Sequence, residues 1–268
     1  MLGPIRTHDL RRTTCSVSHV LIGGIEMKGV ILAGGLGKRL EPMTRITNKH
    51  LLPVYNKPMI YYPIQTLVGA GIKDIMIVTG GNNAGDFLRL LGNGQEFDLK
   101  HINYTYQRGE KGIADALSLA EHFAGKQKIV VILGDNIVEK SIKKYVERFL
   151  RQPKGARILI REVPDPERFG VVQLKGKKII SIKEKPKRPK SNYIVTGIYM
   201  YDRQIFDIIR TLKPSWRGEL EITDVNNAYL KKGELYYDIL GGFWTDCGLP
   251  ETLYRATTLV RKKLKNKI

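Results

Sequence analysis

The chain has 268 residues, and its 45 lysines and arginines against 26 aspartates and glutamates give a formal net charge of +19. Apolar residues make up 42% of it, which supports an ordinary core and excludes a collagen, a coiled coil or a fully disordered chain. Two cysteines exclude a disulfide framework and favour a reducing, cytoplasmic location, and no apolar run reaches the roughly 18 residues of a membrane span.

The first 26 residues differ from the rest, because they show neither a helical nor a strand period. We expect residues 1–26 to be a disordered extension or sequence read in from a wrongly assigned start. Residues 27–268 are expected to form one folded domain.

From residue 27, short apolar runs predict buried strands and amphipathic stretches predict helices between them. The strands are expected at residues 28–33, 74–79 and 128–133, and the helices at residues 59–69, 111–124 and 142–150. This alternation favours a parallel sheet covered by helices on both faces.

The second half of the chain is mixed rather than alternating. Strands are expected at residues 157–163, 171–182, 192–201 and 235–240, and helices at residues 202–212, 219–230 and 250–264. These elements are expected to extend the first sheet, which keeps the fold a single α/β domain.

Much of the charge lies in two basic runs. Residues 175–190 hold eight basic side chains against one acidic, and residues 261–267 hold five. Basic surfaces bind phosphate backbones, but neither run has the interleaved aromatic residues that stack on bases. We therefore expect solvated surfaces and no nucleic-acid partner.

A glycine-rich turn with two cations follows the first predicted strand, in the segment LAGGLGKRL at residues 32–40. Glycines let backbone N–H groups approach a phosphate closely. A Walker loop is excluded because Arg39 stands after Gly37 and Lys38, where a Ser or Thr is needed. A dinucleotide-binding fingerprint is excluded because Leu40 stands where its third glycine is needed. Phosphate binding and a plain tight turn both remain open for this segment alone.

Six further segments follow in order. They are NKHLLPVYNKPMIYYP at 48–63, LGDN at 133–136, DPERFGVV at 165–172, EKPKRPKSNYIVTGIY at 184–199, RGELEITD at 217–224 and WTDCG at 244–248. Together with the turn they resemble the sugar-phosphate nucleotidyltransferase family, from Met27 to about Ala256. The resemblance is to short members that use glucose 1-phosphate and thymidine triphosphate and lack the C-terminal helical segment of longer ones.

The resemblance implies a reaction. A sugar 1-phosphate attacks the α-phosphorus of a nucleoside triphosphate in line, and positioning and electrostatics supply most of the catalysis. It implies dTTP and glucose 1-phosphate as substrates, dTDP-glucose and pyrophosphate as products, Mg²⁺ as cofactor and a homotetramer with no membrane partner. It also implies a three-layer α/β fold with a mostly parallel mixed sheet and a Rossmann-like nucleotide-binding half, with residues 27–268 as the catalytic domain.

The resemblance also assigns site residues. The catalytic positions are Arg39, Lys49, Asp135, Lys185 and Asp246. The nucleotide-binding positions are Leu32, Gly34, Gly35, Gly37, Lys38, Arg39, Gln107 and Gly112. The sugar-phosphate-binding positions are Asn136, Gly170, Glu184, Lys185, Val195 and Tyr199. The metal ligands are Asp135 and Asp246.

The chemistry of these side chains suits the roles that the resemblance gives them. Arg39 and Lys49 would contact phosphates, and Asp135 follows a buried strand at the end where open α/β sheets bind ligands. Two carboxylates together with phosphate oxygens suit Mg²⁺. Gln107 offers a donor and an acceptor to a pyrimidine, while Glu184 would accept from sugar hydroxyls and Lys185 would hold the attacking phosphate.

Several positions depart from the family pattern. Lys38 replaces a Thr or Ser, and the alignment of residues 108–111 stays open. His50 replaces a glutamine and is interpreted as a neighbour of the site rather than a base. Phe169 replaces a Tyr, so one hydroxyl contact is expected to be absent. Cys247 is interpreted as a small buried filler, because no cation pair is evident to lower its pKa.

Two alternatives stay open. The first is the same chemistry with UTP or another sugar 1-phosphate, since thymine differs from uracil by one methyl group, worth on the order of 0.8 kcal/mol when buried. The second is a basic nucleic-acid-binding or regulatory relative without catalysis. The presence of all five catalytic positions argues against the second.

Overall fold

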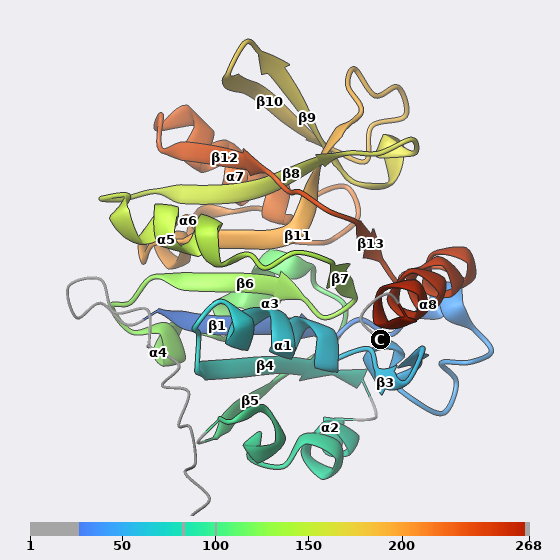
Figure 1. The fold of residues 1–268 in the computed structure, drawn as a ribbon. Helices are drawn as coiled ribbons and strands as arrows, with labels where there is room; N and C mark the ends of the chain where they lie inside the picture. Colours follow the sequence, from blue (N-terminus) through green and yellow to red (C-terminus); the bar gives the residue numbers. More distant parts are fainter. Residues whose placement is uncertain (1–26, 82–83, 100, 266–268) are drawn as a thin grey trace, which may run out of the picture.

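A nine-stranded sheet forms the centre of the computed structural model, which describes residues 27–81, 84–99 and 101–265 (Figure 1). Its main path runs β10-β9-β11-β6-β1-β4-β5, and β8 and β12 join it beside β11. The expectations for residues 1–26 lie outside the described residues.

Four parallel strands make the half of the sheet that comes first in the chain. They are β1 (Lys28–Ala33), β4 (Asp74–Gly80), β5 (Ile102–Gln107) and β6 (Ile129–Leu133). β1 pairs in parallel with β4 and β6, and β4 pairs in parallel with β5. The helices of this half are α1 (Tyr61–Gly69), α2 (Ala84–Leu91), α3 (Ile113–Ser118) and α4 (Glu121–Ala124).

The second half adds mainly antiparallel strands. They are β8 (Ala156–Glu162), β9 (Gly170–Lys175), β10 (Lys178–Glu184), β11 (Tyr193–Tyr201) and β12 (Leu235–Ile239). β11 runs antiparallel to β6, β8 and β9, whereas β12 is parallel to β8. The helices are α5 (Lys143–Arg151), α6 (Gln204–Thr211), α7 (Ile222–Lys231) and α8 (Pro250–Lys265).

Two short antiparallel pairs lie off the main sheet. The first joins β2 (Pro53–Val54) to β3 (Lys57–Pro58). The second joins β7 (Asn136–Val138) to β13 (Trp244–Asp246), and it brings the start and the end of the second half together.

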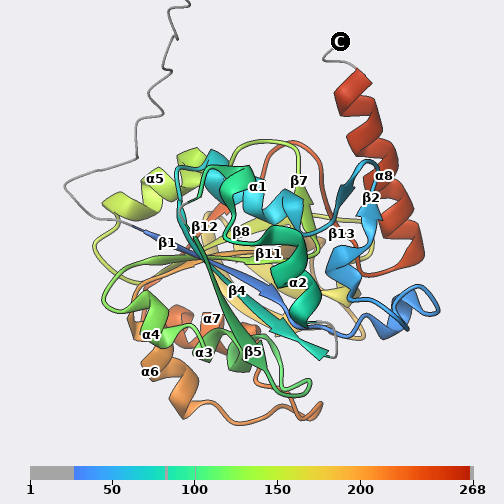
Figure 2. The ribbon, with the colours of Figure 1, turned by 90° about the horizontal axis from the view of Figure 1, so that it is seen from below.

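Successive residues of the strands alternate between two apolar cores, which gives the three layers. Ile31 belongs to the core that contains α1, α2 and α5, while Val30 and Leu32 belong to the core that contains α3, α4, α6 and α7. Figure 2 shows these two sets of helices on opposite sides of the sheet. The prediction of a three-layer α/β fold with a mixed sheet is confirmed.

Three expectations for individual elements need correction. Residues 171–182 form no single strand, because Gly176, at φ +58°, turns the chain into the β9–β10 hairpin. The helix expected at 111–124 is two helices, α3 and α4. β5 went unpredicted because an edge strand with the sequence INYTYQ lacks a continuous apolar run. In the described part of the chain, no helix is both long enough and apolar enough to cross a membrane.

Candidate active site

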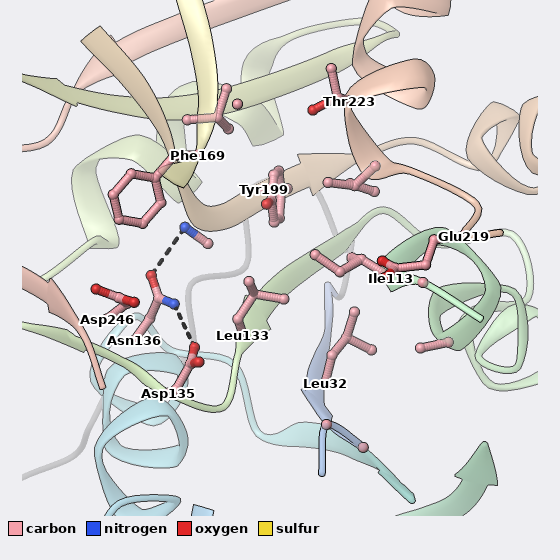
Figure 3. Close-up of a pocket in the computed structure, with 18 of the residues that line it drawn as sticks. Leu32, Ile113, Leu133, Asp135, Asn136, Phe169, Tyr199, Glu219, Thr223 and Asp246 are labelled. Atoms are coloured by element: carbon pink, nitrogen blue, oxygen red, sulfur yellow. Dashed lines mark hydrogen bonds between the residues drawn. The ribbon is translucent and has the colours of Figure 1, made fainter. Parts of the chain in front are cut away.

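A cavity of about 300 Å³ opens where β1 and β6 end, between the two halves of the sheet (Figure 3). Leu32 and Leu133, at these strand ends, form part of its apolar floor together with Val195 and Tyr199 of β11. The carboxyl ends of neighbouring parallel strands are where open α/β sheets bind ligands. Residues from both halves of the chain therefore face one space.

The glycine-rich turn forms one wall. Gly34 and Gly35 line the cavity, and a Cβ on Gly34 would lie 3.1 Å from Gln107 Oε1. Gln107 Nε2 donates to the Gly112 carbonyl at 3.1 Å and to Asp115 Oδ2 at 2.8 Å. With the amide N–H groups engaged inside the protein, Oε1 is the atom of Gln107 turned toward the glycines.

Two residues predicted to bind nucleotide, Gly37 and Lys38, are not among those that line the cavity. Gly37 has φ +71°, and a Cβ there would lie 2.8 Å from Lys49 Cβ, so the glycine lets the turn pack on Lys49. The Lys38 side chain is 69% exposed and its Nζ lies 2.7 Å from Glu110 Oε2. Lys38 therefore ties the turn to the loop before Gly112.

Lys49 and Asp135 form a largely buried ion pair, with Nζ 2.6 Å from Oδ2. Burial alone would raise the pKa of Asp135, but the Lys49 ammonium holds that pKa well below its usual range. Asp135 is therefore ionised at any pH at which the protein would work. Arg39 lines the same wall and is exposed.

The β7–β13 pair delivers the second carboxylate. Asp246 stands opposite Asn136 in this pair, and the Cys247 N–H donates to the Asp135 carbonyl at 2.9 Å. Figure 3 shows Asp135, Asn136 and Asp246 together at one corner of the cavity. Burial, and then the charge of Asp135, raise the pKa of Asp246, while Arg168 Nη2 donates to its Oδ2 at 2.9 Å.

The amide of Asn136 is fixed by three hydrogen bonds. Its Nδ2 donates to Asp135 Oδ1 at 3.0 Å (Figure 3), and its Oδ1 accepts from the Gly197 N–H at 3.0 Å and from Trp244 Nε1 at 2.6 Å. A Cβ on Gly197 would lie 2.5 Å from Asn136 Nδ2, so only glycine fits there. Asn136 thus connects β11 and β13 to the first carboxylate.

The two carboxylates fit a magnesium ion that a triphosphate carries in. No group of three or more His, Cys, Asp or Glu side chains that could enclose a metal occurs among the described residues. Mg²⁺ commonly takes one or two protein carboxylates and completes its shell with phosphate oxygens and water. Two nearby side chains that are both negative when ionised suit such an ion, and burial followed by the charge of Asp135 raises the pKa of Asp246.

The opposite wall belongs to the second half of the chain. Glu184 ends β10, and its Oε2 accepts from Thr223 Oγ1 at 2.6 Å. Burial raises the pKa of Glu184, although this hydrogen bond opposes the shift. Lys185 adopts φ +40°, and its Nζ lies 3.8 Å from Glu184 Oε1. A Cβ on Gly170 would lie 3.0 Å from Thr223 Oγ1, so this glycine keeps the wall open.

Sequence reasoning missed several residues that line the cavity. Glu110 lies in the region whose alignment was open, and five others lie inside the quoted segments: Arg168, Glu219, Ile222, Thr223 and Trp244. The motifs DPERFGVV, RGELEITD and WTDCG contain most of these residues. A motif does not reveal the role of a residue whose contact partner lies far away in the sequence.

Three departures from the family pattern find a physical explanation. His50 is buried, its Nδ1 lies 2.7 Å from Asn48 Oδ1, and burial lowers its pKa to about 3, so it is a poor base. Cys247 is fully buried and burial raises its pKa well above the usual value, which fits a filler rather than a nucleophile. Phe169 packs edge-on against Trp244, with ring centroids 5.6 Å apart.

Comparison with known proteins agrees with this geometry. Residues 28–263 match the family described as nucleotidyl transferase. The glucose-1-phosphate thymidylyltransferase of Neisseria meningitidis serogroup A is 46% identical over 239 residues, which cover 88% of this chain and 83% of the relative. The Mycobacterium tuberculosis enzyme of the same name is 42% identical, with 88% and 82% covered.

Two solved structures are similar along nearly the whole length. One is a Bacillus anthracis protein in complex with a sucrose, described provisionally as a glucose-1-phosphate thymidylyltransferase. It is 54% identical, has a TM-score of 0.84, and the match covers 88% of this chain and 95% of that one. The other is a UDP-glucose pyrophosphorylase complexed with UDP-glucose, 26% identical with a TM-score of 0.80, covering 89% and 100%.

Proposed function

Since the chain belongs to the nucleotidyl transferase family, we propose that it transfers the thymidylyl group of dTTP to glucose 1-phosphate, giving dTDP-glucose and pyrophosphate. Relatives named for this reaction are 42–46% identical over 88% of the chain. The UDP-glucose pyrophosphorylase shares the fold at only 26% identity. Use of dTTP is therefore better supported than use of UTP.

One observation carries the proposal. A single cavity joins the glycine turn, Arg39 and Lys49 on one wall to Glu184 and Lys185 on the other, and the two carboxylates lie at its corner. Two anionic substrates need opposing cationic walls, and their reacting phosphates need a bound cation between them. The arrangement has cations on both walls and, at the corner, two carboxylates that would hold such a metal ion.

On the nucleotide wall, Gln107 Oε1 is placed to accept the N–H of a pyrimidine edge, since its own N–H groups are engaged elsewhere. The backbone of Gly34 and Gly35 lets the nucleotide approach closely. Arg39 and Lys49 would hold the triphosphate and stabilise the charge that develops on the departing pyrophosphate.

On the sugar wall, Glu184 would accept hydrogen bonds from sugar hydroxyls and Lys185 would orient the attacking phosphate. A phosphate oxygen of the sugar 1-phosphate forms a bond to the α-phosphorus, and the bond from that phosphorus to the bridging oxygen breaks in line. The nucleophile is already anionic, so no general base is required, and the neutral, buried His50 agrees with this.

Asp135 and Asp246 would hold Mg²⁺. When bound, the ion supplies positive charge at the phosphate oxygens, which lowers the cost of bringing two anions together. Lys49 keeps Asp135 ionised and Asn136 fixes its orientation, so the carboxylate is charged and oriented before the ion arrives. We also propose that the enzyme works as a homotetramer in the cytoplasm, which light scattering and cell fractionation would test.

The proposal is tested by a substrate matrix of dTTP, UTP, ATP and GTP against several sugar 1-phosphates, with Mg²⁺ and pyrophosphatase. Phosphate release should be fastest with dTTP and glucose 1-phosphate. Faster release with UTP would favour the uridylyl alternative. No release with any pair, together with tight, salt-sensitive DNA binding, would favour a nucleic-acid-binding relative.

A further inference from the structure

Arg168 occupies a position between two carboxylates at the edge of the cavity. It ends a short 3₁₀ turn, Pro166–Arg168, immediately before the residues Phe169 and Gly170 that line the sugar wall. Its Nη1 donates to Asp165 Oδ2 at 2.6 Å and its Nη2 donates to Asp246 Oδ2 at 2.9 Å. The side chain is 20% exposed, and its guanidinium lies 5.0 Å from the centre of the Phe169 ring.

Each carboxylate proposed to hold the metal faces a cation of the chain. Lys49 pairs with Asp135 at 2.6 Å, and Arg168 pairs with Asp246 at 2.9 Å. The charge of Arg39 also acts on Asp246, because it opposes the rise in the pKa of that carboxyl. A free Mg²⁺ ion must therefore compete with cations that the protein itself supplies.

These cations differ in what they would do once substrate arrives. Lys49 and Arg39 lie on the nucleotide wall and would pair with the phosphates of a bound nucleotide. Arg168 has a second carboxylate, Asp165, which can keep its charge paired when Asp246 is taken away. A buried charge that loses its only partner is costly, and Arg168 avoids that cost.

The hydrogen bonds of Arg168 also leave a donor unused. Its Nε–H is buried without an acceptor, and among the described residues only one other buried side-chain atom, Asn226 Nδ2, is in that state. Buried donors are normally satisfied in a finished structure. The unsatisfied Nε–H fits a guanidinium that changes its set of partners during the reaction cycle.

We propose that Arg168 is a positioning residue that holds Asp246 in the place of the metal until the nucleoside triphosphate brings Mg²⁺ in, and this rests on the magnesium site of the proposed function. Arg168 thereby keeps the affinity of the empty enzyme for the free ion low. The negative charge of the triphosphate shifts the balance, so metal and nucleotide enter together. Asp165 keeps the guanidinium paired when Asp246 turns to the ion.

The proposal is tested by binding Mn²⁺ alone to the ligand-free protein and counting free ion by electron paramagnetic resonance. Arg168→Gln should tighten Mn²⁺ binding about tenfold or more, the scale on which outer-shell partners act on metal sites. Arg168→Lys, which keeps the charge, should bind Mn²⁺ nearly as the wild type does. A purely structural arginine would instead weaken the site when it is replaced.

Two further variants locate the effect. Asp165→Asn removes the other carboxylate of Arg168 and leaves the pair with Asp246, so it should not tighten Mn²⁺ binding. Combining Arg168→Gln with Asp246→Asn should abolish the tightening. If Arg168→Gln does not fold, Arg168→Met takes its place. Mn²⁺ binding by the neutral variant that equals or falls below the wild type overturns the proposal.

This outcome is separable from that of the proposed function. If wild-type protein converts dTTP and glucose 1-phosphate but the neutral variant binds Mn²⁺ no more tightly, the role of Arg168 is wrong and the function stands. If no substrate pair reacts but Mn²⁺ binding tightens through Asp246, the role of Arg168 stands and the function is wrong.

Discussion

At the scale of single residues, the site is a set of charges whose partners come from distant parts of the chain. Asp135 depends on Lys49 for its low pKa and on Asn136 for its orientation. Both the ion pair with Lys49 and the hydrogen bond from Asn136 involve the negative charge of the Asp135 carboxylate. A substitution that removes this charge but keeps the size of the side chain therefore tests the role of the charge.

Asp135→Asn should lower kcat/KM by at least about 100-fold, because it removes a metal ligand and the counter-charge of Lys49, while the similar size preserves the fold. Initial rates and circular dichroism check this. The matched control is Asp207→Asn, whose carboxylate is 80% exposed and pairs with Arg210 on the surface, so activity should not change. An Asp135→Asn enzyme within about fivefold of wild type would contradict the assignment.

The pH dependence of sugar-phosphate use should follow Glu184. Burial raises the pKa of this carboxyl, so it takes up a proton at a higher pH than an ordinary glutamate as the solution is acidified. A protonated Glu184 accepts fewer hydrogen bonds from sugar hydroxyls, so kcat/KM for the sugar phosphate should fall on the acid side.

The Thr223 hydroxyl stabilises the ionised form of Glu184 through the 2.6 Å hydrogen bond. Thr223→Ala should therefore move the acid limb of the pH profile to higher pH, and Thr223→Ser should leave it in place. Measuring kcat/KM from pH 5 to 8 for both variants decides. An acid limb that stays put in Thr223→Ala would show that another group controls it.

The motifs of the sequence pointed to residues that the structure brings together. Arg39, Lys49, Glu184 and Lys185 come from separate motifs and line one cavity, and their roles there remain predictions. Lys38, which the resemblance assigned to nucleotide binding, is not among the lining residues, because its ammonium pairs with Glu110, a partner that the local sequence does not identify.

At the scale of elements, the β7–β13 pair holds the two carboxylates together. Trp244 contributes by donating its indole N–H to Asn136 Oδ1 at 2.6 Å and by packing on Phe169. Neither short strand carries a pattern long enough to predict from sequence, since each spans three residues. This explains why these two strands were found only through the motifs LGDN and WTDCG.

Trp244→Phe should reduce the free energy of unfolding by about 1–3 kcal/mol, because it leaves a buried amide oxygen short of one donor while preserving most of the ring packing. It should also lower kcat/KM by loosening Asn136. Urea unfolding and initial rates test both effects. Trp216→Phe, at a side chain that is 92% exposed, is the control and should change neither. Equal stability of the two variants would contradict the role of the pair.

The glycine turn offers a second test at this scale. Gly37→Ala should destabilise the turn by about 1–3 kcal/mol, because it combines strain at positive φ with a Cβ 2.8 Å from Lys49 Cβ, and it should displace Lys49 and reduce kcat/KM. Gly176 also has a positive φ, but a Cβ there would meet open space. Gly176→Ala should therefore cost only the backbone strain, and the variant should keep its activity. Identical rates for the two variants would show that the turn does not position Lys49.

At the scale of the whole molecule, the short apolar runs predicted three of the four strands in the parallel half, β1, β4 and β6, because a strand buried on both faces leaves a continuous apolar signal. The β9–β10 hairpin and β5 lie toward the two ends of the sheet. Strands there have solvent-exposed residues, so their apolar sequence pattern is weaker. Their exact form depends on neighbours in space rather than on local sequence.

The positive charge of the chain belongs to the same scale. Replacing Lys175, Lys177 and Lys178 in the β9–β10 hairpin by glutamine should change kcat/KM by less than about twofold at physiological salt, since exposed charges far from a site are screened. Initial rates at two ionic strengths check this. A loss of more than about tenfold would mean that the hairpin takes part in substrate binding.

The most direct test of the central claim follows the phosphorus atoms of dTTP. With glucose 1-phosphate, Mg²⁺ and wild-type protein, label in the α-position should appear entirely in dTDP-glucose, and label in the γ-position entirely in pyrophosphate, in equal amounts. Release of the α-label as free nucleotide, or no labelled nucleotide-sugar at all, would contradict the assignment of this cavity to thymidylyl transfer.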